Sequence, residues 1–268
     1  MPELPEIAAR ASEMNAELRG KMILNVEVLQ PKCLNLSAGD FIASLTGAEF
    51  KRTTFHGKWL MTDTSQGWFL LNLGMGGEIL LVTRQTLPEK RRLIFDFIDG
   101  SALSINFWWF GYAHYVATNR LAEHKMTAML GPNATDLDVD GLRTLIKGQR
   151  TQLKTFLLDQ AKIAGIGNAY IHDILFLAGL HPLRLLPTLS DEEIARLQHA
   201  IHTGLQPSID KGGAFYEVNL HGQKGGFVVE DIIIGYREGQ PCPVCGTTIQ
   251  KIKTGSNSSF ICPACQVI

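Results

Sequence analysis

The first apolar residues of the chain recur at the spacing of one helix face. Ile7, Ala11, Met14 and Leu18 lie at positions i, i+4, i+7 and i+11, and Gly20 follows the last of them. Side chains at this spacing lie on one side of an α-helix, so the pattern predicts an amphipathic helix that Gly20 ends.

After residue 20 the pattern changes to short segments in which apolar and polar residues alternate. Alternation is typical of β-strands with one buried face, and a series of such strands up to about residue 128 predicts a β-sandwich. The expected strands cover residues 23–29, 48–54, 59–62, 68–73, 78–82, 93–98 and 103–107.

From Leu137 onward the apolar spacing is helical again. Ser190 and Glu193 have the spacing of a capping box at the start of the last expected helix. Residues 131–136 are the expected linker between the strand-rich and the helical part. The expected helices cover residues 138–147, 150–160, 168–178 and 190–206.

Four of the five cysteines form two Cys-x-x-Cys pairs near the end of the sequence. Cys242 and Cys245 make the first pair, Cys262 and Cys265 the second, and sixteen residues separate them. This spacing predicts one structural zinc ion per chain, held by four thiolates with no open position. The alternatives are two disulfides, which a reducing cytoplasm opposes, and a redox pair, which would not need duplication. Cys33 is expected to be a buried small apolar residue.

The segment between the cysteine pairs is expected to be a β-hairpin. Residues 247–253 alternate, residues 254–257 (Thr-Gly-Ser-Asn) form the expected turn, and residues 258–261 return. Residues 241–268 contain Lys251 and Lys253 and no acidic residue. We therefore expect the hairpin tip to contact something anionic.

Composition limits the possible partners and locations. The 268 residues are 45% hydrophobic, with a formal net charge of −1 and a pI near 6.7, which argues against a generally basic nucleic-acid coat. Any nucleic-acid binding must therefore be local. No apolar run approaches the roughly 18–20 residues of a membrane span, and no signal peptide precedes the first helix, so a soluble, cytoplasmic protein without a membrane partner is expected.

The chain begins with the sequence Met-Pro-Glu-Leu-Pro-Glu. Removal of Met1 would leave Pro2 as a secondary amine, with the carboxyl groups of Glu3 and Glu6 nearby. An α-amino group has a pKa of about 7.7–8.0, so part of it is unprotonated at neutral pH and can attack an aldehyde-level carbon. Glu3 is the expected acid. Taken alone, the hexapeptide also fits an ordinary helix start, with proline in the first turn and glutamate at the positive end of the dipole.

A glycine-rich turn, Gly165-Ile166-Gly167-Asn168, precedes one of the expected helices. Glycines let backbone N–H groups approach an anion, so this turn can bind a phosphate. The alternative is a tight turn between two helices.

These motifs together resemble the formamidopyrimidine-DNA glycosylase/endonuclease VIII family. The amino-terminal hexapeptide, His56-Gly57-Lys58, residues 73–77 (Leu-Gly-Met-Gly-Gly), the glycine turn at 165–168 and the four-cysteine finger occur in the family's order, over essentially the whole chain. The resemblance implies an α+β multidomain fold: an N-terminal helix plus β-sandwich, a helix-two-turn-helix domain and a zinc-finger hairpin, with DNA in the cleft between domains. The expected domains are residues 1–130, 137–234 and 235–268.

The resemblance also implies site residues. Pro2 would attack C1′ of a flipped, damaged nucleotide, with Glu3 opening the sugar and Glu6 supporting the site. Lys58 joins this catalytic group and, with Asn168, matches positions that hold the flanking phosphates. The remaining implied DNA contacts are Met75, which fills the gap in the base stack, and Lys154, Lys251 and Lys253. The glycine-rich segment 211–226 is similar in position to the family's lesion-capping loop and is expected to be mobile.

Three positions depart from the family pattern. Where relatives carry Asp-Pro-Arg-Arg-Phe-Gly, residues 106–111 read Asn-Phe-Trp-Trp-Phe-Gly, so the arginine that reads the opposite base is missing. Trp108, Trp109 and Phe110 can stack on bases but offer no bidentate recognition. At least one tryptophan is expected to face the sandwich core. Asn257 replaces an arginine at the hairpin tip and Asn72 a histidine, and both are still expected to contact DNA.

The predicted function is therefore a DNA base-excision repair glycosylase with apurinic/apyrimidinic lyase activity, acting through a Schiff base on Pro2 followed by β- and δ-elimination. We expect it to be a monomer that binds damaged DNA and associates with the nucleoid when bound. The alternatives are a protein that binds damaged or structured DNA without cutting it, and a zinc-ribbon regulator that binds RNA or protein.

Overall fold

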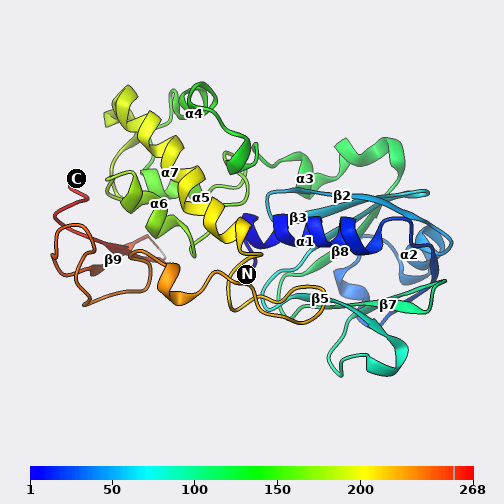
Figure 1. The fold of residues 1–268 in the computed structure, drawn as a ribbon. Helices are drawn as coiled ribbons and strands as arrows, with labels where there is room; N and C mark the ends of the chain where they lie inside the picture. The colour runs from blue at the N-terminus through cyan, green and yellow to red at the C-terminus, as the bar shows by residue number, and fades with distance from the viewer. Residues whose placement is uncertain (256) are drawn as a thin grey trace. The chain divides into compact units, whose positions relative to one another are not determined.

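The computed structural model describes residues 1–255 and 257–268 (Figure 1). The chain divides into two compact units. One unit contains residues 1–129 and 211–226, and the other contains residues 130–210 and 227–268. Segment 211–226 thus returns from the second half of the sequence to the amino-terminal unit.

Two four-stranded antiparallel sheets form the body of the first unit. Their strand orders are β1-β6-β7-β5 and β2-β3-β4-β8. The strands are β1 (Ile23–Val28), β2 (Phe50–His56), β3 (Trp59–Thr64), β4 (Gly67–Asn72), β5 (Glu78–Thr83), β6 (Leu93–Phe97), β7 (Ser101–Asn106) and β8 (Tyr112–Val116). The expected β-sandwich is confirmed.

The core of this unit joins both sheets and the first helix. Phe50 and Phe69 of one sheet pack with Phe95 of the other, and their ring centroids lie 4.9–6.4 Å apart. Helix α1 (Leu4–Leu18) lies along β2 and β3 (Figure 1). It buries the predicted face of Ile7, Ala11, Met14 and Leu18. Cys33 is buried in the same core, as expected.

Short helices lie between the strands of this unit and after the last of them. They are α2 (Ala38–Leu45), α3 (Lys125–Ala128) and the 3-10 turns at Pro31–Cys33, Arg84–Thr86 and Thr118–Glu123. The alternation pattern predicted seven strands and missed both α2 and β8. Ser37 accepts a hydrogen bond from the Asp40 N–H at the start of α2, so a local capping pattern was present in the sequence.

The second unit is helical and carries the cysteine hairpin. Its elements are α4 (Val139–Ile146), α5 (Leu153–Leu158), α6 (Ile171–Leu177), α7 (Asp191–Asp210), 3-10 turns at Ala134–Asp136, Leu186–Thr188 and Val229–Asp231, and strands β9 (Gln250–Thr254) and β10 (Asn257–Ile261). Helix α7 packs against α4 and α6 (Figure 1). The Ser190/Glu193 capping box at its start is confirmed, with both reciprocal hydrogen bonds present.

The hairpin packs on helix α6 through a small apolar cluster. Phe176 and Ile234 are buried together with Ile249 and Phe260 of the finger. The predicted hairpin is confirmed, although its first strand begins at Gln250 rather than at residue 247. Its expected turn includes Ser256, which lies outside the described residues. No helix in the described part of the chain is long and apolar enough to cross a membrane.

Candidate active site and metal centre

Pro2 and Glu6 line one small cavity in the first unit. Pro2, Glu3 and Glu6 are all buried, although Met1 is exposed. Helix α1 begins at Leu4, with Glu3 as its N-cap residue. The structure thus brings together the three amino-terminal residues predicted from the sequence. Their expected catalytic roles stay predictions.

Glu6 uses both carboxylate oxygens to hold neighbouring backbone. Its Oε2 accepts the Glu3 N–H at 2.8 Å, and its Oε1 accepts the Ala214 N–H at 3.2 Å. The first bond fixes the backbone next to Pro2, and the second fixes the returning loop. A carboxylate at the start of a helix also interacts favourably with the helix dipole.

Loop 211–226 folds back on itself and on helix α1. The Gly226 N–H donates to the Lys211 carbonyl at 2.8 Å, and the Leu220 N–H donates to Glu13 Oε2 at 3.0 Å. The loop also extends the sandwich, because the Leu81 N–H on edge strand β5 donates to the Leu220 carbonyl at 2.8 Å. The segment expected to be mobile is therefore anchored at its ends and its centre in this structure.

Arg10 is the buried cation beneath this loop. Its guanidinium donates to the carbonyl oxygens of Val218 and Gly212 and forms an ion pair with Glu13. Burial lowers the pKa of Arg10, although Glu13 opposes the shift. Burial likewise raises the pKa of Glu13, against the attraction of Arg10. The two shifts have the same physical cause, because each charged group loses water that its partner only partly replaces.

Asn72 joins the two loops that carry Lys58 and Met75. Its side-chain N–H donates to the Lys58 carbonyl at 3.1 Å, and its Oδ1 accepts the Gly74 N–H at 3.0 Å. Both ends of this amide are therefore used within the protein. Lys58 itself is half-buried in the turn between β2 and β3.

Met75 and the aromatic segment form one exposed tip. The Met75 N–H donates to the Trp109 carbonyl at 2.9 Å, and the Trp108 N–H donates to the Met75 carbonyl at 3.2 Å. Gly74 permits this approach, because a Cβ there would lie 2.1 Å from the Trp109 carbonyl oxygen. Phe110 has a φ of 56°, a left-handed conformation that is uncommon for an aromatic residue.

The expectation that a tryptophan faces the sandwich core is wrong. Trp108 is 61% exposed, Trp109 is 64% exposed and Phe110 is 70% exposed, whereas Phe107 is buried. Phe107 belongs to the core cluster and occupies the place expected for an indole. The three following rings are thereby available to a partner, together with Met75.

Asn168 lies in the turn before α6, which begins three residues later than the expected helix. Its side chain is half-buried, and its Oδ1 has no hydrogen-bond partner among the described residues. The Tyr236 hydroxyl donates to its backbone carbonyl at 3.3 Å.

Lys154 is buried and fully engaged within the second unit. Its Nζ donates to Thr254 Oγ1 at 3.1 Å, to the Ser258 carbonyl at 2.7 Å and to Ser259 Oγ at 2.9 Å. Burial lowers the pKa of Lys154 to about 8. In this structure Lys154 ties helix α5 to the hairpin, and its expected DNA contact stays a prediction. The other three predicted hairpin contacts, Lys251, Lys253 and Asn257, are exposed.

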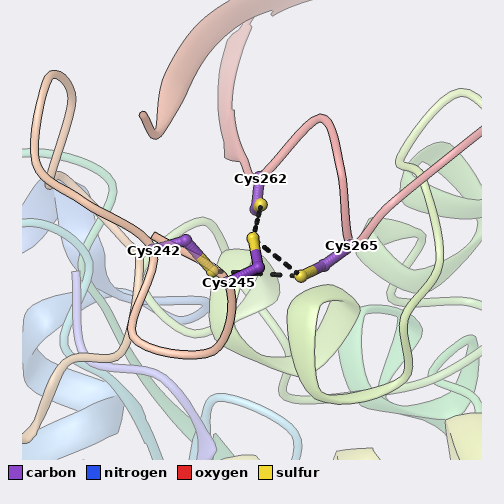
Figure 2. Close-up of side chains that lie close together, drawn as sticks. All are labelled: Cys242, Cys245, Cys262 and Cys265. Carbon is purple, nitrogen blue, oxygen red and sulfur yellow. Dashed lines mark hydrogen bonds between the residues drawn. The ribbon is translucent and has the colours of Figure 1, made fainter. Parts of the chain in front are cut away.

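The sulfur atoms of Cys242, Cys245, Cys262 and Cys265 converge from the two ends of the hairpin (Figure 2). All four lie within 4.8 Å of one another, and three of the sulfur–sulfur distances are 3.4, 3.5 and 3.9 Å. Tetrahedral zinc with Zn–S bonds of about 2.3 Å places its sulfurs about 3.8 Å apart. The donor set therefore fits one zinc ion.

Comparison with known proteins identifies the family. Three family models match in order: the formamidopyrimidine-DNA glycosylase N-terminal domain over residues 1–106, its H2TH domain over residues 130–219, and a zinc finger found in FPG and IleRS over residues 239–267. The formamidopyrimidine-DNA glycosylase of Pediococcus pentosaceus is 34% identical over 275 residues, which cover 100% of both proteins. The chain belongs to the formamidopyrimidine-DNA glycosylase family. The enzyme of Sodalis glossinidius is 32% identical over 99% of this chain and 100% of that protein.

Solved structures of the formamidopyrimidine-DNA glycosylase family share the fold. A complex between the Lactococcus lactis enzyme and DNA containing an abasic site has a TM-score of 0.91 at 26% identity, over 99% of this chain and 100% of that one. A MutM complex with DNA containing carbocyclic 8-oxo-G has a TM-score of 0.90 at 27% identity, over 100% of both chains. The family and the fold class predicted from the sequence are confirmed, and the cysteine cluster is the structural zinc site of this family's finger.

Sequence reasoning missed two residues, Arg10 and Glu217, that line the same cavity as Pro2. Arg10 was not recognised because a single cation in an amphipathic helix is ordinarily solvated. Glu217 lines the same cavity as Pro2. Glu217 reaches this cavity because loop 211–226 returns to the first unit, and no local pattern in the sequence predicts that return.

Proposed function

We propose that this protein is a DNA glycosylase with apurinic/apyrimidinic lyase activity that acts in base-excision repair through a Schiff base on Pro2. Family membership over nearly the whole chain assigns the glycosylase activity, and lyase activity is characteristic of the family. The observation that carries the detailed mechanism is the cavity that both Pro2 and Glu6 line. Glu3, which lies between these two residues in the sequence, is also buried.

In the proposed reaction the Pro2 nitrogen, once Met1 is removed, attacks C1′ of the damaged nucleotide. Glu3 gives a proton to the sugar oxygen as the ring opens. The base leaves with the electron pair of its bond to C1′ and takes up the proton that the Pro2 nitrogen loses, which leaves an iminium on C1′. The cationic iminium acidifies the adjacent C–H, which permits β-elimination and then δ-elimination of the flanking phosphates. C1′ cannot be reached inside the stacked duplex, so the nucleotide must first leave the helix.

The DNA contacts are proposed from the family resemblance for Lys58 and Asn168, and from exposure and charge for Lys251 and Lys253. Lys58 and Asn168 would hold the phosphates that flank the flipped nucleotide, and Lys251 and Lys253 would contact backbone further along. Met75 would enter the gap in the stack with the neighbouring aromatic rings. The proposed partner is damaged DNA, and its phosphates complement these local cations although the whole chain has a net charge of −1.

We further infer that the protein acts as a monomer in the cytoplasm and joins the nucleoid when bound to DNA. One chain contains both the proposed nucleophile and the zinc finger. Sedimentation of the zinc-loaded protein with and without abasic-site DNA tests the stoichiometry, and a second protein chain per DNA would contradict it.

Borohydride reduction in the presence of abasic-site DNA tests the function. An enzyme that forms an iminium is trapped covalently on the DNA, and a chain that only binds is not. Intact-mass measurement of the same sample shows whether Met1 is absent, because an amide nitrogen on Pro2 cannot attack. Binding without trapping by protein that lacks Met1 would favour the alternative of a damaged-DNA binding protein that does not cut.

A further inference from the structure

Glu217 is a carboxyl group beside the amino terminus that the reaction described above does not use. It lines the same cavity as Pro2, Glu6 and Arg10. Backbone hydrogen bonds hold it within its loop: its N–H donates to the Ala214 carbonyl at 3.0 Å, and its carbonyl accepts the Gly225 N–H at 3.1 Å. The side chain therefore has a defined place in the fold.

The loop is fixed to helix α1 on both sides of Glu217. Before it, the Ala214 N–H binds Glu6 Oε1 at 3.2 Å. After it, the Val218 carbonyl accepts a hydrogen bond from Arg10 Nη1. Gly213 lets the loop approach closely, because a Cβ at this position would lie 3.2 Å from Glu6 Cγ. The two anchors hold the segment that contains Glu217 beside helix α1, where Glu217 lines the same cavity as Pro2.

The charged groups that face Glu217 come from three elements. Glu6 and Arg10 belong to α1, Glu78 begins β5 and lines the same cavity, and the amino group is that of Met1 at the start of the chain. Burial raises the pKa of Glu217 to about 7; the Met1 amino group and Arg10 oppose this rise, and Glu6 adds to it. An α-amino group, such as the one that removal of Met1 would give Pro2, has a pKa of about 7.7–8.0. Proton transfer from that group to Glu217 is therefore nearly balanced in free energy.

We propose that Glu217 accepts the proton that the Pro2 ammonium must lose before it attacks, and returns that proton to the departing oxygen. This inference rests on the proposed Schiff-base function. It gives loop 211–226 a chemical role in addition to any contact with the damaged base.

The step balances for an abasic site in its open aldehyde form. The Pro2 ammonium passes one proton to the Glu217 carboxylate and becomes a neutral amine. The nitrogen lone pair forms a bond to C1′, and the carbonyl π electrons move to oxygen, which takes the second N–H proton to give a carbinolamine. The Glu217 carboxylic acid then protonates that hydroxyl, the C1′–O bond breaks, and water and the iminium result. Glu217 ends as the carboxylate with which it began.

Single-turnover trapping with cyanoborohydride and a preformed abasic oligonucleotide tests this role from about pH 6 to about pH 9.5, a range that brackets both groups. With wild-type protein the rate is expected to rise with a midpoint near the pKa of Glu217. Glu217→Gln cannot accept the proton, so the rate at about pH 6.5 should fall at least tenfold. In Glu217→Gln the midpoint of the pH–rate profile should move towards the pKa range of an α-amino group. Near pH 9 the wild-type and Glu217→Gln rates should differ by about twofold or less. Glu217→Asp should restore much of the early rise.

Glu13→Gln is the matched control, because Glu13 anchors the same loop through Leu220 and Arg10 and does not line the Pro2 cavity. Glu13→Gln should lower the trapping rate by the same factor at every pH and leave the midpoint of the pH–rate profile unchanged. A Glu217→Gln profile that changes in the same uniform way, or does not change, would overturn the proposal while leaving the Schiff-base function intact. Absence of trapping by wild-type protein that lacks Met1, at any pH, would instead overturn the proposed function itself.

Discussion

The backbone N–H of Glu3 donates a hydrogen bond to Glu6 Oε2 at 2.8 Å. This bond joins the backbone of Glu3 to the carboxylate of Glu6 and does not involve the Glu3 carboxyl group. Glu6 is committed to the backbone through both of its oxygens, because Oε1 binds the Ala214 N–H. In the proposed mechanism the two glutamates therefore have different roles: Glu6 positions the amino-terminal segment, and Glu3 supplies the proton.

The division predicts different results for the two glutamine variants. Glu3→Gln should still bind abasic DNA but cut it roughly 100-fold more slowly or worse, because the acid is lost and the shape is kept. Glu6→Gln keeps one acceptor oxygen and should weaken trapping less. Blocking the Pro2 amine should remove trapping, whereas Pro2→Gly should retain a weak level through its primary amine. Single-turnover cleavage rates measure these differences, and undiminished cleavage by Glu3→Gln would contradict the assignment of Glu3 as the acid.

The zinc finger should depend on its metal for folding. Replacing any one of the four cysteine ligands with serine should release zinc and abolish DNA binding before the β-sandwich unfolds, since a short hairpin takes most of its folding free energy from the metal. Cys33→Ser is the control and should retain one zinc per chain. Elemental analysis of freshly purified protein gives the stoichiometry. Well under one zinc in the wild type would contradict the prediction.

Periodicity predicted the elements whose burial is regular and failed where the fold depends on distant contacts. Helix α1 has one apolar face, so its pattern appears directly in the sequence. Loop 211–226 has no periodic pattern, and its position comes from Glu6, Arg10 and Glu13 in a helix some 200 residues earlier, as in the Glu6–Ala214 separation of 208 residues. Likewise, no pattern in the sequence around Trp108 indicates that Phe107, rather than a tryptophan, packs into the core.

Lys154 should stabilise the hairpin through its three hydrogen bonds to residues 254, 258 and 259. Lys154→Met fills a similar volume but leaves these oxygens without their donor. We expect the second unit to lose about 1–3 kcal/mol of unfolding free energy and to release zinc faster to a chelator. Urea unfolding and chelator kinetics measure the two effects. Exposed Lys147→Met is the control, and equal behaviour of the two variants would contradict the structural role.

The buried histidine pair of the sandwich should make the first unit sensitive to acid. His114 Nδ1 and His124 Nε2 lie 2.8 Å apart, and burial, aided by His124, lowers the pKa of His114 to about 4 from its ordinary value of 6.5. Between these values the unfolded chain binds more protons than the folded one, so the unfolding free energy falls as pH drops from 6.5 to 4.

Replacing this histidine should flatten the dependence. His114→Gln removes the titrating group, so the slope of unfolding free energy against pH should decrease by the equivalent of about one proton over that interval. Urea midpoints at several pH values give the slope. His221→Gln, at an exposed histidine of the same unit, should leave it as in the wild type. An unchanged slope in His114→Gln would show that other groups control acid unfolding.

Opposite-base discrimination should be weak, because the exposed tip presents ring faces rather than a bidentate donor pair. Stacking of a base on an aromatic side chain contributes about 1–3 kcal/mol and tolerates every base. A bidentate arginine contact, by contrast, discriminates by about 1–3 kcal/mol between bases. Excision rates with the four bases opposite one lesion should therefore agree within about fivefold, and lesions in bubbles should be processed comparatively well. Trp108→Ala should slow all four duplexes by a similar factor, while Met129→Ala, at another exposed apolar side chain of the unit, should change none. A strong preference for cytosine opposite the lesion, kept in Trp108→Ala, would show that another part of the protein reads that base.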